Sequence, residues 1–220
     1  MGDTFAITTD DVQVLIVDDR IVLCGSSNIN DRSQMGTHDS ELTIVMEDTN
    51  TLPSMMDGQE YQAGHHAATL RRMLWREHLG LLPAQELDAS EDPNAQPPND
   101  CANDWCEGDE YDKFVADPLS DDLWKMWCDR ATTNTDVFRY LFHADPDDVI
   151  KTFKDYEEFL PGKDRKQGHL FNKYMPAEDI RKSLDKIKGH LVWFPLRFLE
   201  DAQMAERGLQ VNAYTESVYT

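Results

Sequence analysis

The first hydrophobic pattern along the chain is a pair of short runs of branched apolar residues, at Val14–Val17 and Ile21–Leu23. The polar tripeptide DDR at 18–20 separates these runs. Two apolar runs joined by a short polar turn are typical of a β-hairpin whose strands are buried. A third strand is predicted at Glu41–Met46, where ELTIVM has a similar composition.

Helical periodicity begins in the segment from Gln62 to Leu79, where apolar residues recur at helical spacing. Gly80 follows and predicts the end of this helix. Three arginines in the segment, Arg71, Arg72 and Arg76, lie on another face of the predicted helix. We expect that face to be solvated.

The region after residue 116 predicts further helices. The sequence DPLSDDLWKMW begins one of them, with Ser120 as N-cap and acidic residues in the first turn, where the helix dipole favours negative charge. Other helices are predicted at Asp136–Phe142, Asp147–Leu160 and Glu178–Lys188. Gly189 ends the last of these, and the apolar stretch HLVWFPLRFL follows.

Together these elements predict an α/β fold in which helices cover at least one face of a mixed β-sheet. Hydrophobic residues make up 40% of the chain, which is enough to form a core. We expect Trp124, Trp127 and Trp193 to anchor that core rather than to contact lipid.

Charge is distributed unevenly along the chain. The formal net charge is −21, and the segment from Glu86 to Asp122 holds 13 acidic residues and one basic residue. Such a balance argues against binding to nucleic acid or steady attraction to an anionic membrane. Residues 84–110 are rich in Pro, Asn, Asp and Glu, and we expect them to form a flexible insertion.

The cysteines and the termini indicate the compartment. Cys24, Cys101, Cys106 and Cys128 fit neither a zinc site nor a disulfide framework, so free thiols in a reducing compartment are expected. No apolar run approaches the roughly 20 residues that cross a bilayer, and the amino end has no signal-peptide pattern. We therefore expect a cytoplasmic protein without a transmembrane segment, for which peripheral membrane contact remains open.

One motif in the sequence indicates a catalytic site. The stretch VLIVDDRIVLCGSSNINDRS, continued by HDSE, contains Asp18, six further residues, and then Gly25, Ser26, Ser27 and Asn28. It resembles the second signature of the phospholipase D superfamily in its eukaryotic, phosphatidylcholine-hydrolysing branch. That signature is His, any residue, Lys, four residues, Asp, six residues, and then Gly-Ser/Gly-x-Asn. In isolation, a Gly-Ser-Ser-Asn sequence is ordinary turn chemistry, and the register with Asp18 favours the motif.

Further sequence segments extend the resemblance to this family over roughly residues 14–200. Among them are MDGQEYQAG, WREHLG, KDYEEFLPG and KGHLVWFPLRFL. It implies one half of the phospholipase D fold, followed by a mostly helical C-terminal region. The expected organisation is a non-family leader at 1–13, the C-terminal part of a second catalytic half at 14–83, the acidic insertion at 84–110, and the family's C-terminal region at 111–220.

The family cleaves phosphodiesters through a covalent phospho-histidine and needs two signature copies in one site. By resemblance, Asp18 fixes the motif's backbone, Ser26 and Asn28 belong to the phosphate-gripping end, and Glu41 orients the histidine. The positions of the family His and Lys hold Asp11 and Gln13. The carboxylate at position 11 would repel a phosphate, so we expect this chain alone to be inactive; no cofactor or metal site is expected.

Two explanations of the degenerate signature remain open. The similarity starts abruptly at Val14, so the chain is either the C-terminal part of a longer phospholipase D or a short paralogue without catalysis. The first explanation implies a phosphatidylcholine substrate and a missing N-terminal catalytic half as partner. The second implies a lipid- or protein-interaction module. An acidic protein-binding module unrelated to lipids would rest on residues 84–122 alone. His38, a loop residue, is expected to be an ordinary polar side chain.

Overall fold

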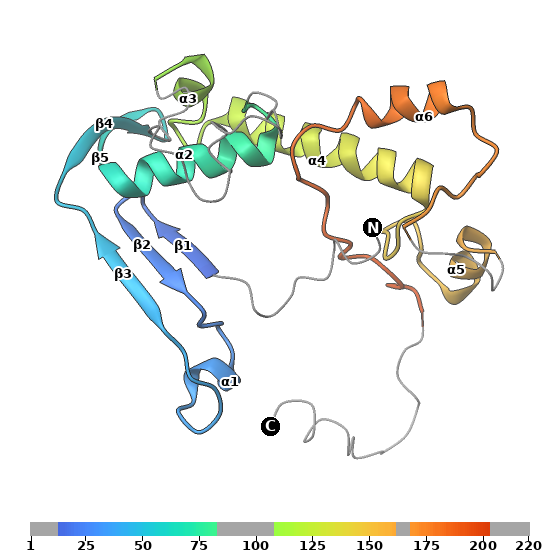
Figure 1. Cartoon of the computed structure of the whole chain (residues 1–220), viewed down its shortest axis with the longest axis horizontal. Coiled ribbons are helices and arrows are strands. Elements are labelled where there is room, and N and C mark those ends of the chain that lie inside the picture. The colour runs from blue at the N-terminus through green and yellow to red at the C-terminus, as the bar shows by residue number, and fades with distance from the viewer. Residues whose placement is uncertain (1–12, 83–107, 162–167, 203–220) are drawn as a thin grey trace, which may run out of the picture. The chain divides into compact units, whose positions relative to one another are not determined.

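The computed structural model describes residues 13–82, 108–161 and 168–202 (Figure 1). The chain divides into two compact units, one formed by residues 1–47, 138–180 and 194–220, and the other by 48–137 and 181–193. Asp11, Cys101 and Cys106 lie outside the described residues, as does most of the expected acidic insertion.

The first unit contains a three-stranded antiparallel sheet of β1 (Gln13–Val17), β2 (Ile21–Gly25) and β3 (Thr43–Glu47), shown in blue in Figure 1. The predicted hairpin is confirmed, and the third strand begins two residues later than predicted. The expected burial of the hairpin strands is wrong, because Val14, Leu15 and Val17 of β1 are exposed. Asp18 and Asp19 turn the chain between β1 and β2 with φ of 50° and 49°. Aspartate tolerates this left-handed conformation better than most residues, which explains the two acids at the turn.

The register of this sheet depends on Gly25. Gly25 pairs with Gln13 on one side and with Thr43 on the other. A Cβ atom at position 25 would clash with the Leu42 carbonyl oxygen and would lie 2.5 Å from the Cα of Thr43. Only a residue without a side chain lets β3 approach this closely.

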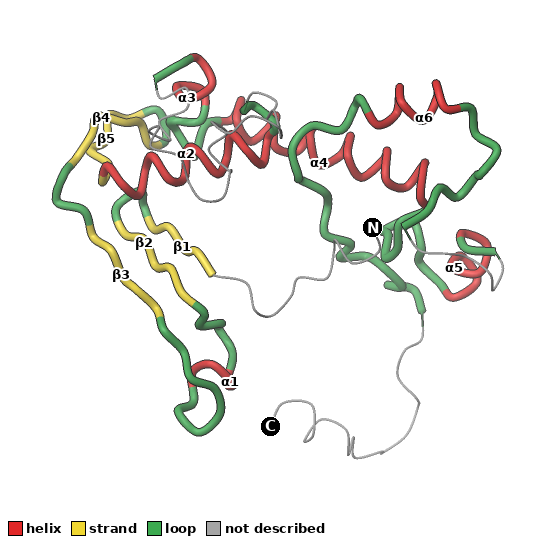
Figure 2. Tube along the Cα trace, in the orientation of Figure 1, coloured by secondary structure: helices red, strands yellow, loops and turns green. Residues whose placement is uncertain are grey.

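The second unit begins with a hairpin that the sequence analysis did not predict, formed by β4 (Thr51–Met56) and β5 (Gln59–Gly64) (Figure 2). Asp57 and Gly58 form its turn with φ of 54° and 69°. An Asp-Gly pair between strands is a hairpin signal that could have found it. All strand pairs among the described residues are antiparallel, where a mixed sheet was expected. The α/β fold class is confirmed.

Helix α2 (His65–Leu79) follows β5 directly, so it begins three residues later than predicted. Its end is confirmed, because Gly80 adopts a left-handed conformation with φ of 67° and donates to the carbonyl of Glu77. Gly80 also lies against the backbone of Gly189, where a Cβ atom would meet the Gly189 nitrogen. Two glycines thus let the end of α2 contact a segment more than a hundred residues later in the chain.

The expectation that Arg71, Arg72 and Arg76 face solvent is wrong, because all three are buried. Arg72 donates to the Ser54 hydroxyl at 2.9 Å and to the Asp112 carboxylate at 3.3 Å. Arg76 pairs with the other oxygen of Asp112 at 3.8 Å. Asp112, itself buried, belongs to α3 (Glu110–Phe114). These guanidinium groups therefore join α2 to β4 and α3, and burial is tolerated because each charge has acceptors.

Arg71 is held in the same way by backbone acceptors. Its guanidinium donates to the carbonyl oxygens of Val115 and Ala116 at 2.8 and 2.9 Å. It also lies over the ring of Trp75, 4.7 Å from the centroid. The carbonyls past the end of α3 are thus satisfied by a helix that lies some forty residues earlier in the chain.

Helix α4 (Asp121–Phe142) is continuous, whereas the sequence predicted one helix start after Ser120 and a separate helix at Asp136–Phe142. Its interior, ATTNTD, contains poor helix formers but neither Gly nor Pro. Asn134 lies in this stretch and is buried, and its side chain bonds the backbone of Lys188 and Leu191. These tertiary hydrogen bonds compensate for the weak propensity.

The last two predicted helices are shorter than expected. Helix α5 (Phe153–Phe159) has Thr152 as its N-cap, and the Thr152 side chain forms a capping box with Asp155. Residues from Asp147 onward do not join it, because the Asp147 carboxylate caps a turn and pairs with Arg139 at 2.7 Å. Helix α6 (Ala177–Leu184) ends four residues before the predicted end, ahead of Gly189.

The core of the second unit is formed by Leu79, Val115 and Leu123, with Trp75 and Trp127 packed against it. The two tryptophan rings meet edge to face, with their centroids 5.2 Å apart. The prediction that Trp127 anchors the core is confirmed. The same prediction is wrong for Trp124 and Trp193, both of which are exposed. Figure 1 shows α2 and α4, which carry most of this core.

We predict that Arg72→Met destabilises the protein by about 3 kcal/mol, because it leaves the buried Asp112 with a weaker counter-charge and Ser54 without its donor. Urea unfolding measures the loss as a lower transition midpoint. The matched control is Lys125→Met on the exposed surface of α4, expected within about 0.5 kcal/mol of the wild type. Equal effects of the two substitutions would contradict the role of the buried charge.

We also predict that Gly25→Ala lowers the free energy of unfolding by about 1–3 kcal/mol, because β3 must move to admit the Cβ atom. Gly36→Ala is the control, since a Cβ atom there meets nothing within 4 Å. Unfolding monitored by circular dichroism compares the two variants. A Gly25 variant as stable as the Gly36 variant would show that the sheet register does not need glycine.

Candidate functional site

The antiparallel register gathers most of the motif at one end of the β1–β3 sheet. Gln13 begins β1, Gly25 ends β2 and Thr43 begins β3, and the three are paired across the sheet. Ser26 follows β2 directly, and Glu41 lies two residues before the start of β3, so both lie at the same end. This end of the sheet therefore collects residues from three separate parts of the motif.

Asp18 is not part of this group. It lies in the turn that joins the other ends of β1 and β2, where Val17 pairs with Ile21. At a rise of about 3.3 Å per residue, the five steps from Ile21 to Ser26 span about 16 Å, and Asp18 lies beyond the Ile21 end of this span. A role of Asp18 in fixing the backbone of the motif, which the resemblance implies, stays a prediction. Asp11, at the position of the family histidine, lies outside the described residues.

Ser26 and Glu41 form the central contact of the site. The Ser26 hydroxyl donates to the Glu41 carboxylate at 2.5 Å and accepts from the Leu42 backbone nitrogen at 3.2 Å. The Ser26 nitrogen in turn donates to the Leu42 carbonyl at 3.1 Å. The three bonds fix the carboxylate beside the end of β2, although both side chains remain in contact with solvent.

The loop between β2 and β3 contains a short helix, α1 (Asp31–Gln34), which sequence analysis did not predict. Asn30 is its N-cap and accepts from the Ser33 nitrogen at 2.9 Å, and the Asn-Asp pair at 30–31 is a signal that could have found it. Asn28 is joined to this helix through its carbonyl, which accepts from the Gln34 side chain at 2.9 Å.

The far part of the loop is closed by an ion pair between Arg32 and Asp39, whose Nε and Oδ2 atoms are 2.5 Å apart. Both are exposed, so the pair contributes little to stability and mainly shapes the loop. His38 is exposed, and its backbone nitrogen donates to the Met35 carbonyl. This is consistent with an ordinary loop residue.

The pKa of Glu41 is lowered from its ordinary value, chiefly by the hydrogen bond from Ser26 and then by one from the Ser33 hydroxyl. A nearby carboxylate, Asp39, acts in the opposite direction, and Arg32 adds a weak lowering effect. Because the folded state binds this proton less readily than the unfolded state, the interaction stabilises the fold above the ordinary pKa. The stabilisation is lost as the pH falls through the lowered pKa.

This arrangement provides an ionised acceptor but no nucleophile among the described residues of the motif. Glu41 is suited to accept a hydrogen bond from an imidazole, which is the family role of this position. Gln13, at the start of β1, has a neutral amide where the family has a lysine. An amide can donate a hydrogen bond to a phosphate oxygen but cannot neutralise its charge.

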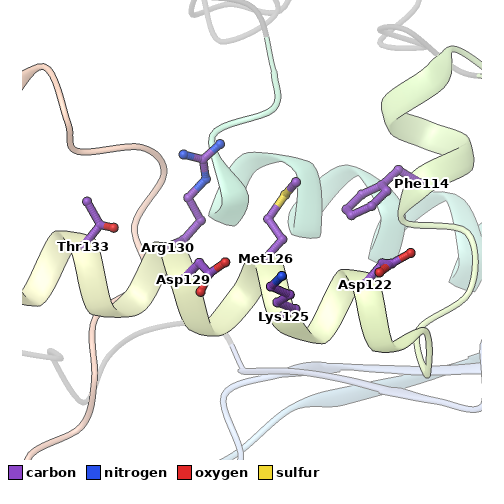
Figure 3. Close-up of a pocket in the computed structure, with 7 residues that line it drawn as sticks. All are labelled: Phe114, Asp122, Lys125, Met126, Asp129, Arg130 and Thr133. Carbon is purple, nitrogen blue, oxygen red and sulfur yellow. The ribbon is translucent and has the colours of Figure 1, made fainter.

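A separate hollow of about 360 Å³ lies along α4 in the second unit, bordered by Phe114 from α3 (Figure 3). Its remaining lining residues come from α4: Asp122, Lys125, Met126, Asp129, Arg130 and Thr133. It contains no residue of the motif, and acids and bases alternate along it. Among the described residues, no cluster of His, Cys, Asp and Glu could hold a metal, and no helix is long and apolar enough to cross a bilayer.

We predict that Ser26→Ala raises the pKa of Glu41 toward its ordinary value of 4.5, because the strongest hydrogen bond to the carboxylate is lost. NMR titration of the Glu41 side-chain carboxyl carbon measures the change. Ser27→Ala is the control, since the Ser27 hydroxyl accepts from Thr43 at 2.9 Å. If both variants titrate as the wild type does, Ser26 does not determine the ionisation of Glu41.

Known proteins resemble this chain over most of its length. The family model described as phospholipase D matches residues 4–121, a range that includes the motif and also part of the expected leader. The chain is similar to phospholipase D2 of Bos taurus, with 33% identity over 189 residues, and to phospholipase D1 of Homo sapiens, with 34% identity over 197 residues. Phospholipase D zeta 1 of Arabidopsis thaliana is 34% identical over 202 residues.

The matches cover 86%, 87% and 85% of this chain but only 17%, 15% and 16% of the three relatives, respectively. The chain therefore spans about a sixth of the length of the relatives it matches. The matched family model, the agreement over most of the chain, and the Gly-Ser-Ser-Asn end of the motif point to one assignment. This chain belongs to the phospholipase D family.

Proposed function

We propose that this chain is the C-terminal part of a phospholipase D that cleaves phosphatidylcholine to phosphatidate and choline through a phospho-histidine. It supplies one half of the catalytic site and is inactive by itself. Asp18, Ser26, Asn28 and Glu41 are its motif residues in this proposal, and the nucleophile and the phosphate-gripping lysine come from elsewhere. A cytoplasmic location with peripheral membrane contact is part of the proposal.

The observation that carries this proposal is the exposure of the β1–β3 sheet on both faces. Val14 and Ile44 flank Cys24 in the register, and Leu15 and Val45 flank Leu23, so the two sets lie on opposite faces. The four flanking side chains are between 46% and 64% exposed. Soluble domains rarely leave such contiguous apolar surface uncovered, which supports a packing partner on each face of the sheet.

Inactivity of the isolated chain is expected for two reasons, which are the charge at the nucleophile position and the number of signature copies. A phosphodiester is anionic, and the Asp11 carboxylate at the nucleophile position repels it while the neutral Gln13 offers no compensating cation. Removal of the nucleophile from an enzyme of this covalent type, measured in a serine protease, costs roughly a million-fold in turnover. The reaction also requires a second signature copy to protonate the leaving alcohol.

A second candidate is a short paralogue that retains the fold without catalysis and acts as a lipid- or protein-interaction module. The replacement of both catalytic positions, by Asp11 and Gln13, favours it as much as it favours a fragment. The two candidates differ in what covers the exposed sheet: the fragment requires a catalytic half from the same gene, and the module requires a different partner. A sequence read of the native transcript across residues 1–14 separates them.

We predict that the wild-type chain releases no choline from phosphatidylcholine above background. The double variant Asp11→His/Gln13→Lys is also expected to be inactive alone, because the first signature copy is absent. Mixed with a separately expressed N-terminal catalytic half, the double variant should gain activity, and the wild-type chain should remain roughly a million-fold lower. Choline release in a coupled assay measures all four combinations. Turnover by the wild-type chain alone would overturn the half-site proposal.

A further inference from the structure

Two histidines meet where the end of α2 crosses residues 188–191 of the same unit. The two backbones lie very close at this point, since a Cβ atom at Gly189 would clash with the His78 carbonyl oxygen. The His190 backbone nitrogen donates to the same carbonyl at 3.0 Å. The imidazole rings of His78 and His190 lie with their centroids 6.1 Å apart and their planes at 81°. The crossing therefore brings together two side chains that ordinarily change charge near neutral pH.

The two rings have different surroundings. His78 is half-buried, and its ring meets the ring of Trp127 on α4 edge to face, with the centroids 6.4 Å apart. The His190 side chain is 64% exposed, and its Nε2 atom lies 3.7 Å from a carboxylate oxygen of Glu77. Among the described residues, the charged groups that act on His78 are His190 and Glu77, while α4 presents the neutral indole of Trp127. A positive charge on His78 is thus placed between an aromatic ring and a second imidazole.

The pKa of His78 is lowered from its ordinary value of 6.5, chiefly because burial disfavours the charged ring and then because of the positive charge of His190. Glu77 acts in the opposite direction, and its effect is the weakest of the three. The closed contact therefore binds this proton less readily than a form in which the ring is solvated. By linkage, the contact is favoured above pH 6.5 and is progressively lost as the pH falls from there through the lowered pKa.

We propose that the contact of α2 with residues 188–191 is a pH-sensitive switch, which is closed when His78 is neutral and opens when His78 is protonated. In the open form the His78 ring is solvated, so that its charge is hydrated, and the His190 nitrogen loses its acceptor. Gly80 and Gly189 have left-handed backbones with φ of 67° and 66°, and they form the crossing point at which the two segments separate.

The switch acts on the end of α2 and leaves the contact with α4 in place. The buried Asn134 side chain donates to the carbonyl oxygens of Lys188 and Leu191 at 2.9 and 2.8 Å. None of these groups titrates near neutral pH, so protonation of the histidines does not weaken the bonds directly. Residues 188–191 therefore stay on α4 while the end of α2 moves away from them.

His78 is the sensor, and His190 assists it. The exposed ring of His190 keeps its contact with water in the closed and the open form, and the Glu77 carboxylate lies near enough to offset its charge. The half-buried ring of His78 gains hydration only when the contact opens. The difference in proton binding between the two forms thus arises mainly at His78.

The first test is NMR titration of the imidazole rings in the full chain. The His78 ring should titrate with a midpoint below 6.5, and His190→Gln should move that midpoint upward, because the second imidazole charge is removed. The control His169→Gln changes an exposed histidine outside this cluster and should leave the His78 midpoint unchanged. A wild-type His78 midpoint at or above 6.5 would overturn the proposal.

Amide hydrogen exchange at pH 7 and pH 5 measures the opening itself, after correction for the pH dependence of exchange in an unfolded chain. Protection of the His190 amide should fall at least about threefold between these values. The Val115 amide, which donates to the Tyr111 carbonyl elsewhere in the same unit, should change less. In the neutral variant His78→Gln, protection at position 190 should no longer depend on pH. An undiminished dependence in this variant would show that His78 is not the sensor.

Gly189→Ala tests the same contact without changing a titratable group. Because its Cβ atom would clash with the His78 carbonyl oxygen, the variant should be open at both pH values. Protection at position 190 should already be low at pH 7, and the His78 midpoint should lie closer to 6.5 than in the wild type. Gly58→Ala is the matched control, since Gly58 has a φ of 69° and a Cβ atom there meets nothing within 4 Å.

Circular dichroism establishes that the variants are folded, and the two measurements on the wild-type chain decide the proposal where a variant does not fold. A folded Gly189→Ala variant in which His78 titrates as in the wild type would contradict the coupling between the contact and the proton. No readout depends on hydrolysis of a phosphodiester, so the switch and the proposed function can fail independently.

Discussion

The site of this protein depends on the close approach of β2 and β3 at Gly25. Because side chains alternate along a strand, a shift of one residue in this register would move every apolar side chain of the sheet to the opposite face. It would also separate Ser26 from Glu41, whose 2.5 Å contact needs both residues just beyond the paired ends of their strands. The close approach of β3 thus requires the glycine of the Gly-Ser-Ser-Asn motif for a structural reason that is independent of phosphate chemistry.

In the second unit, helix α2 fixes the positions of the neighbouring segments, as Gly25 fixes the register of the β1–β3 sheet. Its buried guanidinium groups satisfy a carboxylate on α3, a hydroxyl on β4 and two backbone carbonyls. Its end lies against Gly189, so the same helix positions a segment more than a hundred residues later in the chain. Buried ion pairs add little net stability compared with apolar contacts, but they strongly penalise any arrangement in which one charge loses its partner. They therefore specify which segments surround α2.

The first of these features bears on function. The sheet holds an ionised glutamate at a motif whose nucleophile position is an aspartate, and its apolar faces remain exposed. This combination supports the proposal that the chain supplies one half of a composite site.

The sequence by itself determined the β1–β2 hairpin, the end of α2 at Gly80, and the family, because these follow from local polarity, glycine chemistry and the spacing of the motif. Tertiary structure decided that Arg71, Arg72 and Arg76 are buried, that α4 is continuous through Asn134, and that Trp124 and Trp193 are exposed. The physical reason is the same in each case. A pattern records how polar a residue is, but the cost of burying it depends on hydrogen-bond partners contributed by segments that are distant in the sequence.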